Sequence, residues 1–129
     1  MGWWRKVRKP LLRVITTCIV ILVLFFLGMM IISNRNEQNY KQAIDLLNDG
    51  QYDQAIAIFS SLNDYSDSNQ LAMESEYLKA QHLELNGDRD GAIALYLSIG
   101  DYKESKDKYQ QLSADKLFDS GMYSQAWDI

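Results

Sequence analysis

The most prominent feature of the hydrophobic pattern is an apolar run near the N-terminus. Residues 14–32, VITTCIVILVLFFLGMMII, contain no charged side chain. With Leu11 and Leu12 the run covers residues 11–32 and is interrupted only by Arg13. A helix that rises about 1.5 Å per residue is then long enough for a hydrocarbon core of about 30 Å. The pattern predicts a transmembrane helix over residues 11–32, with the lipid bilayer as its partner.

Two other interpretations of this run are open. A buried helix of a soluble protein needs apolar neighbours on every side, and the rest of a 129-residue chain is too small to provide them. A cleavable signal peptide has an apolar core of about 7–15 residues and a small-residue cleavage site. This run is longer, and the segment LGMMIISNRN at its end lacks such a site. A retained anchor is therefore favoured.

Basic side chains next to the run predict its orientation. All basic residues of the first 32 precede residue 14, and no acidic residue accompanies them. They are Arg5, Lys6, Arg8, Lys9 and Arg13. Because positively charged flanks remain in the cytoplasm, we expect a cytoplasmic head over residues 1–10. A linker over 33–38 then leads to an extracytoplasmic domain over 39–129, in a single-pass protein of the cell membrane.

The pattern of residues 39–129 repeats itself. GQYDQAIAIFSSLNDYSDS begins at Gly50, and GDRDGAIALYLSIGDYKES begins at Gly87, 37 residues later. A third, shorter copy begins at Gly121, after a further 34 residues. Periods of this length are typical of stacked units that cannot bury their apolar faces alone. We divide the region into units over about 39–63, 64–100 and 101–129, the last of them incomplete.

Each unit has the apolar spacing of two helices. Tyr52, Ala55, Ile56, Phe59 and Leu62 follow one another at spacings of three, one, three and three positions, and so form one helical stripe. The pattern predicts short helices over 52–62 and 89–99 and long helices over 65–85 and 102–119. No stretch alternates with period two for long enough to indicate a strand. The fold class that we expect is all-α, with the N-terminal transmembrane helix followed by about two and a half helical hairpins.

The segments between units predict where these helices end and begin. Asn63 and Gly100 occupy equivalent positions, and both residue types readily adopt the left-handed conformation that ends helices. Asp64 and Asp101 follow directly, and aspartate is a strong N-cap. We therefore expect one helix to stop and the next to start within about two residues.

Composition excludes several function classes. The chain has a net charge of −4, but residues 33–129 carry eight basic against seventeen acidic side chains, which disfavours binding to nucleic acid. Cys18 is the only cysteine and His82 the only histidine, so no disulfide and no His/Cys metal site is expected. No phosphate-binding loop or nucleophile motif occurs. We expect no catalytic, cofactor-binding or metal site, no small-molecule substrate and no enzymatic activity.

The segments GQYDQAIAIF and GDRDGAIALY resemble the turn and second helix of tetratricopeptide repeats. Ala43, Ala80 and Ala114, each seven residues before a glycine, match the small residue of that family's first helix. The usual proline between repeats is absent, and DY-x-[DE]-S replaces it, as in membrane-anchored repeat proteins of Gram-positive bacteria. The first helix is also longer and lacks the family's Trp and Leu. A generic array of helical hairpins is the alternative.

The resemblance implies an α-solenoid whose groove binds a protein or peptide. Tyr77, Gln81 and Glu84 lie at i, i+4 and i+7 and could line such a groove, or Tyr77 could belong to the core and the other two to a solvated face. The expected function is a non-enzymatic, membrane-anchored scaffold for protein–protein interaction. The alternative is a structural stalk, or the N-terminal fragment of a longer anchored protein. The last helix pattern stops at Trp127–Ile129 and leaves Leu117, Phe118 and Tyr123 without an expected cover.

Overall fold

The computed structural model describes the backbone of residues 3–126 and the side chains of residues 12–126. Helices make up this part of the chain, and no strand occurs in it, so the all-α class is confirmed. The chain divides into two compact units, one up to Gln38 and one from Asn39 onward. The division falls within a continuous helix, and residues 33–38, expected as a linker, are part of that helix.

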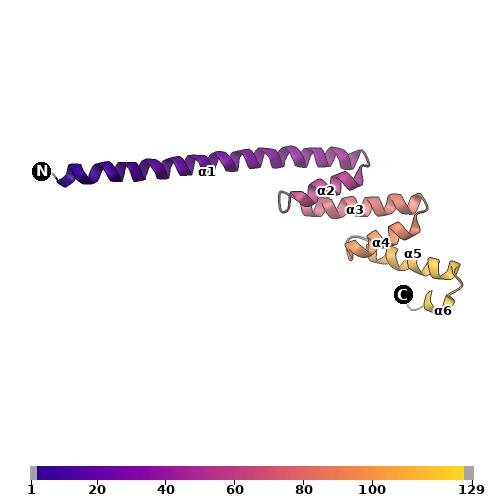
Figure 1. Ribbon diagram of the computed structural model, residues 1–129. Coiled ribbons are helices and arrows are strands. Elements are labelled where there is room, and N and C mark those ends of the chain that lie inside the picture. The colour runs from indigo at the N-terminus through magenta and orange to yellow at the C-terminus, as the bar shows by residue number, and fades with distance from the viewer. Residues whose placement is uncertain (1–2, 127–129) are drawn as a thin grey trace. The chain divides into compact units, whose positions relative to one another are not determined.

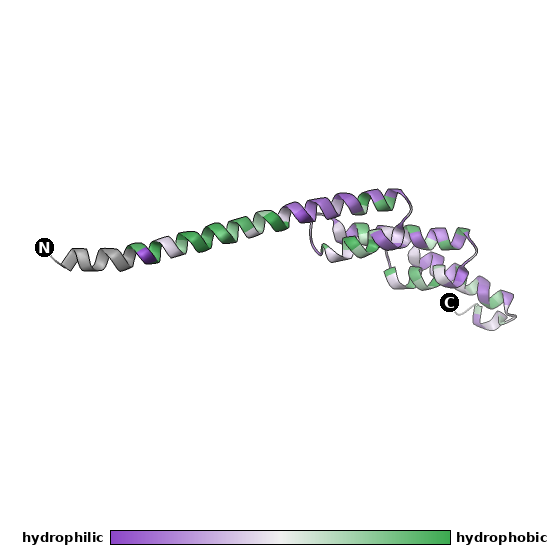
Figure 2. Ribbon diagram, turned by 45° about the horizontal axis from the view of Figure 1, so that its top comes forward, coloured by the Kyte–Doolittle hydropathy of each residue, from purple (hydrophilic) through white to green (hydrophobic). Residues whose placement is uncertain are grey.

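The first unit consists of one helix, the N-terminal part of α1 (Trp3–Asn48). From Leu12 to Ile32 its described side chains are exposed apart from the half-buried Gly28, and the stretch is strongly apolar in Figure 2. Thr16 and Thr17 do not interrupt the apolar surface with free hydroxyls, because both donate hydrogen bonds to the backbone oxygen of Arg13. Polar groups of this stretch are thus satisfied within the helix itself.

The second unit contains the C-terminal turns of α1 and five further helices (Figure 1). These are α2 (Tyr52–Ser61), α3 (Ser68–Leu85), α4 (Arg89–Ile99), α5 (Ser105–Asp119) and α6 (Tyr123–Ala126). From α2 onward each helix packs on the next one along the chain. The short helices α2 and α4 agree with the predicted spans to within one residue at each end.

Two small cores lie in this unit, and they are copies of each other. The first contains Ala43, Ala55, Phe59 and Leu62. The second contains, 37 residues later, Ala80, Ala92, Tyr96 and Ile99, together with Tyr77 and Leu112. The alanines at 43, 55, 80 and 92 have no exposed surface. Their small side chains allow the backbones of neighbouring helices to approach each other closely. Ala114, the third alanine of the pattern, is half-buried.

The predicted starts of the long helices are wrong by three residues. α3 begins at Ser68 and α5 at Ser105, so Asp64 and Asp101 are not their N-caps. Two consecutive turns precede each helix instead: the Tyr65 N–H donates to the Leu62 oxygen, and the Ser68 N–H donates to the Tyr65 oxygen. Equivalent bonds join residues 99–105. The chain therefore uses the residues after Asn63 and Gly100 to change direction rather than to start a helix.

Left-handed backbone positions produce these turns. Asn63 and Gly100 have φ values of 51° and 61°, which confirms the positive φ expected for them. Ser66 and Lys103 are also left-handed, with φ of 54° and 49°, and their residue types gave no signal for it. The serine that closes each junction, Ser68 or Ser105, is completely buried. A small residue is needed there because the turn lies directly against the helices.

Candidate functional site

One helix of the described residues is long and apolar enough to cross a membrane. It covers Leu12–Asn48, and its most apolar window has a mean hydropathy of 2.9 with no buried residue. The unpaired thiol of Cys18 is exposed on it, as expected for a lipid-facing residue. The side chains of the basic head and of the tryptophans at positions 3 and 4 lie outside the described residues, so the orientation remains a prediction.

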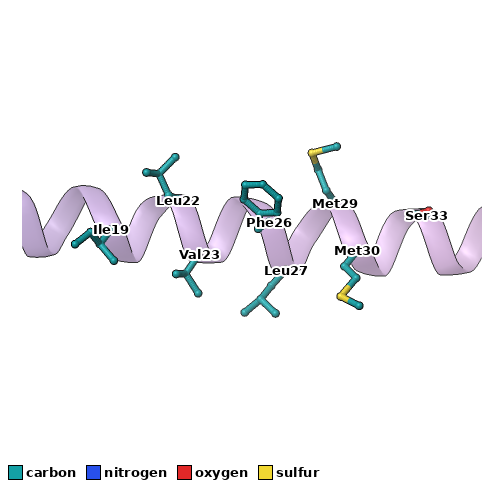
Figure 3. Close-up of a pocket in the computed structure, with 8 residues that line it drawn as sticks. All are labelled: Ile19, Leu22, Val23, Phe26, Leu27, Met29, Met30 and Ser33. Carbon is teal, nitrogen blue, oxygen red and sulfur yellow. The ribbon is translucent and has the colours of Figure 1, made fainter.

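The apolar surface of this helix extends around its circumference. Figure 3 shows Leu22 and Met29 on one side and Val23, Leu27 and Met30 on the other. The hollow drawn there is lined by residues of this helix alone. Its lining residues are Ile19, Leu22, Val23, Phe26, Leu27, Met29, Met30 and Ser33. It is therefore a series of gaps between neighbouring side chains, of the kind that lipid tails fill, and not an enclosed cavity.

The three predicted groove residues lie on α3, and the structure gives them partners within the repeat unit. Tyr77 is only 6% exposed, and its hydroxyl donates to Glu104 Oε2 at 2.9 Å. Glu84 accepts the hydroxyl of Tyr96 at 3.0 Å and the ammonium of Lys108 at 2.9 Å. Gln81 is half-buried between them. Tyr77 thus belongs to the core, while a partner groove along this stripe stays a prediction.

The contacts that these residues make were not predicted from the sequence. Glu104 precedes α5, Tyr96 lies on α4 and Lys108 lies on α5. The 37-residue period nevertheless contained a signal for one of these contacts. Tyr40 and Asp67 precede Tyr77 and Glu104 by one period, and the Tyr40 hydroxyl donates to Asp67 Oδ1 in the same way. An aromatic residue and an acidic residue separated by 27 positions in both copies therefore marked a contact.

Surface ion pairs recur with the same period. Lys79 of α3 pairs with Asp53 of α2, and Lys116 of α5 pairs with Asp90 of α4, the latter at 2.6 Å. The aspartates of both pairs are largely exposed, and the lysines are partly exposed. A screened pair of this type contributes about 0–1 kcal/mol, so these pairs align the helices more than they stabilise them.

The second junction contains a denser group of charges. Glu74 accepts the Tyr102 hydroxyl at 2.7 Å and pairs with Lys103. The Lys103 ammonium lies 4.9 Å from the ring centre of Tyr77 and 5.5 Å from that of Tyr102, within reach of cation–π attraction. Burial, followed by the hydrogen bond to Glu74, raises the pKa of Tyr102 to about 12. Tyr102 therefore keeps its proton and remains a donor at any physiological pH.

The junction acids are held in the charged form. The hydrogen bond from Tyr40 lowers the pKa of Asp67, and the hydrogen bond from Tyr77 lowers the pKa of Glu104. Among the described residues no group of three His, Cys, Asp or Glu side chains is arranged to hold a metal ion. His82 is exposed, with its ring centre 5.9 Å from that of Tyr52. Asp67 and Glu104 thus join each junction to the helix that carries the tyrosine donor.

Comparison with known proteins adds no family to this description. No family model, no curated protein and no solved structure matches the chain. The class that can be stated is an all-helical protein with one N-terminal helix suited to spanning a membrane and a separate compact helical unit.

Proposed function

We propose that this protein is a non-enzymatic scaffold, anchored by residues 11–32 and presenting residues 39–129 as a tetratricopeptide-like interaction surface outside the cytoplasm. The observation that carries the proposal is the recurrence of the same contacts after 37 residues. Two cores, two Tyr–carboxylate bonds and two Lys–Asp pairs repeat in register. Units that pack on each other through repeated contacts build an extended surface, and extended surfaces of this type bind other polypeptides.

The orientation in this proposal follows from charge. The five basic residues before residue 14 face only Arg35 and Lys41 on the other flank of the apolar run. This imbalance favours a cytoplasmic N-terminus. The acidic repeat unit then lies on the opposite side of the membrane.

Photo-cross-linking at the predicted groove tests the interaction. A photoreactive phenylalanine analogue at Gln81 of the full chain, irradiated in intact cells, is expected to give a discrete adduct with another protein. The control is the same analogue at Ala94, which is exposed on α4. An adduct at 81 that is absent at 94 supports a groove on α3. Equal adducts at both positions, or none, would remove the support for that groove.

The same experiment distinguishes the structural alternative. Contacts that join successive helices, such as Lys79–Asp53 and Lys116–Asp90, stiffen the unit and would also suit a stalk. A self-associating stalk gives adducts with twice the mass of the chain. A stalk without a ligand gives no adduct at position 81, although the protein is folded and located in the membrane.

A further inference from the structure

The two equivalent helix interfaces of the repeat unit differ in chemistry at one internal location. We call the contact of α3 with α1 and α2 the first interface, and the contact of α5 with α3 and α4 the second. In the first interface, Leu47, Phe59 and Leu71 are apolar and belong to one core. One period later, the second interface carries Glu84, Tyr96 and Lys108. All three positions change from apolar to polar together.

The polar set forms one connected network. The Tyr96 hydroxyl donates to Glu84 Oε2 at 3.0 Å, and Lys108 Nζ donates to Glu84 Oε1 at 2.9 Å. Tyr96 has no exposed surface, and the side chains of Glu84 and Lys108 are 28% and 33% exposed. Each of α3, α4 and α5 contributes one member. The network therefore closes only when these three helices meet.

Several contacts outside the network are the same at the two interfaces. The pair Asp53–Lys79 at the first interface and the pair Asp90–Lys116 at the second are chemically the same. The Tyr–carboxylate bonds at the two junctions are also alike. A repeat unit with two similar interfaces can fold with one hairpin skipped, so that α5 takes the place of α3 on α2. Outside the network the second interface also has the pair Arg89–Asp119, where the first has Tyr52 against His82, one period earlier. It has the pair Lys103–Glu74 as well, where the first has Ser66 in place of Lys103. The internal network is a further difference that can oppose this error.

We propose that the network of Glu84, Tyr96 and Lys108 is a register device, which directs α5 to α3 and α4 and excludes it from the surface of α1 and α2. If α5 occupied the first interface, Lys108 would face Leu47 and Phe59 without a carboxylate. Glu84 would in turn lose its ammonium partner. Removing one partner of a largely desolvated ion pair is strongly unfavourable, whereas a complete pair is near neutral relative to an apolar set. The network thus destabilises the skipped register, and it does not need to stabilise the correct fold.

The experiment detects the skipped register directly. In the full chain with Cys18→Ser, cysteines replace Asp53 and Lys116, which are adjacent only if α5 lies where α3 belongs. The protein is unfolded in denaturant and refolded in detergent micelles with a short bis-maleimide present. The intramolecular 53–116 cross-link is compared with the 90–116 cross-link of the correct register, made in a parallel variant.

Making the interfaces alike should increase the wrong cross-link. The variant Glu84→Leu, Tyr96→Phe, Lys108→Leu has two apolar interfaces, and its 53–116 yield is expected to rise roughly tenfold over that of the native network, because no unpaired charge opposes the skipped register. The reverse variant Leu47→Glu, Phe59→Tyr, Leu71→Lys has two polar interfaces and should show the same rise. This reverse variant allows the same test if the variant with two apolar interfaces aggregates.

The matched control exchanges the two sets. A variant with all six substitutions has a polar first interface and an apolar second one, so the interfaces still differ. Its 53–116 yield should return to the native level. A yield that stays low when the interfaces are alike, or that rises equally in the exchanged variant, would overturn the proposal. The second result would show that the substitutions act through local stability alone.

Discussion

At the scale of single residues, the junctions depend on backbone positions that differ in what they tolerate. Gly100 combines φ of 61° with ψ of −125°, a region that only glycine occupies readily. Asn63, at the equivalent position, has φ of 51°, which asparagine adopts at little cost. A side chain introduced at position 100 is therefore strained, whereas position 63 accepts a side chain with little strain.

This difference gives a prediction for two single substitutions. Gly100→Ala is expected to lower the free energy of unfolding by about 1–3 kcal/mol, because an L side chain is strained at that φ and ψ. Asn63→Gly should be near neutral, within about 1 kcal/mol. Urea unfolding of the full chain in detergent, followed by circular dichroism, measures both. A large decrease in the free energy of unfolding for Asn63→Gly, with none for Gly100→Ala, would contradict the backbone conformations assigned to these two positions.

The junction acids predict how stability depends on pH. Because the folded chain lowers the pKa of Asp67 and Glu104, their ionisation stabilises the fold above the unfolded pKa, which is about 4. This contribution is lost as the pH falls from that value through the lower folded pKa. The free energy of unfolding should therefore decrease on acidification below about pH 4.5.

Removal of the two phenol donors should reduce that pH dependence. The variant Tyr40→Phe, Tyr77→Phe keeps the packed rings but removes the hydrogen bonds to Asp67 and Glu104. Tyr109→Phe is the control, because Tyr109 packs on the second core and its hydroxyl donates to neither acid. Urea unfolding at several pH values between 3 and 7 compares the slopes. Equal slopes in the double variant and the control would contradict the assigned role of the phenols.

At the scale of elements, the helix starts follow local geometry that residue type alone does not determine. Asp88 is the N-cap of α4, where its Oδ1 accepts the Gly91 N–H at 3.0 Å. Asp101, which the sequence favours as a cap, precedes α5 by a turn, and its side chain is 90% exposed. Lys106 Nζ lies 3.8 Å from its Oδ1.

Two alanine substitutions separate these roles. Asp88→Ala should reduce the free energy of unfolding by about 0.5–2 kcal/mol, the usual loss for an N-cap. Asp101→Ala should change it by no more than a few tenths of a kcal/mol, as expected for an exposed, weakly paired charge. Thermal and urea unfolding of the two variants give the comparison. The opposite order of effects would restore Asp101 as the cap of α5.

Much of the element pattern was predictable because it follows from apolar spacing. The stripe from Tyr52 to Leu62 and its copy gave α2 and α4 to within one residue, and the alanines at 43 and 80 are buried as expected. The starts of α3 and α5 were not predictable from capping preferences. The left-handed conformations of Ser66 and Lys103 arise from the packing of the junction against neighbouring helices, and neither residue type favours them.

The candidate site was predictable only in part. Tyr77, Gln81 and Glu84 were grouped by helical spacing, but spacing along one helix does not show what lies opposite. Tyr77 and Glu84 find their partners on segments 27 and 24 residues away, in Glu104 and Lys108. Comparing equivalent positions of the two copies would have revealed both the repeated Tyr–carboxylate contact and the place where the copies differ.

At the scale of the whole molecule, the protein consists of two units with different surfaces. One is a helix whose described apolar side chains are exposed, and the other is a compact unit held by its own cores. An apolar helix of this length is stable when lipid surrounds it, whereas the acidic helical unit is suited to water. The charge imbalance around residues 11–32 is the basis of the proposal that the acidic unit faces away from the cytoplasm.

Cysteine labelling in intact cells tests both the membrane anchor and its orientation. In a Cys18→Ser background, Ser60→Cys places a thiol at an exposed position of α2, and Lys9→Cys places one in the basic head. A membrane-impermeant maleimide should label position 60 in intact cells and position 9 only after lysis, with the protein retained in the membrane fraction after alkaline extraction. Labelling of position 9 but not of position 60 in intact cells would reverse the topology, and release of the protein by alkaline extraction would contradict the membrane anchor.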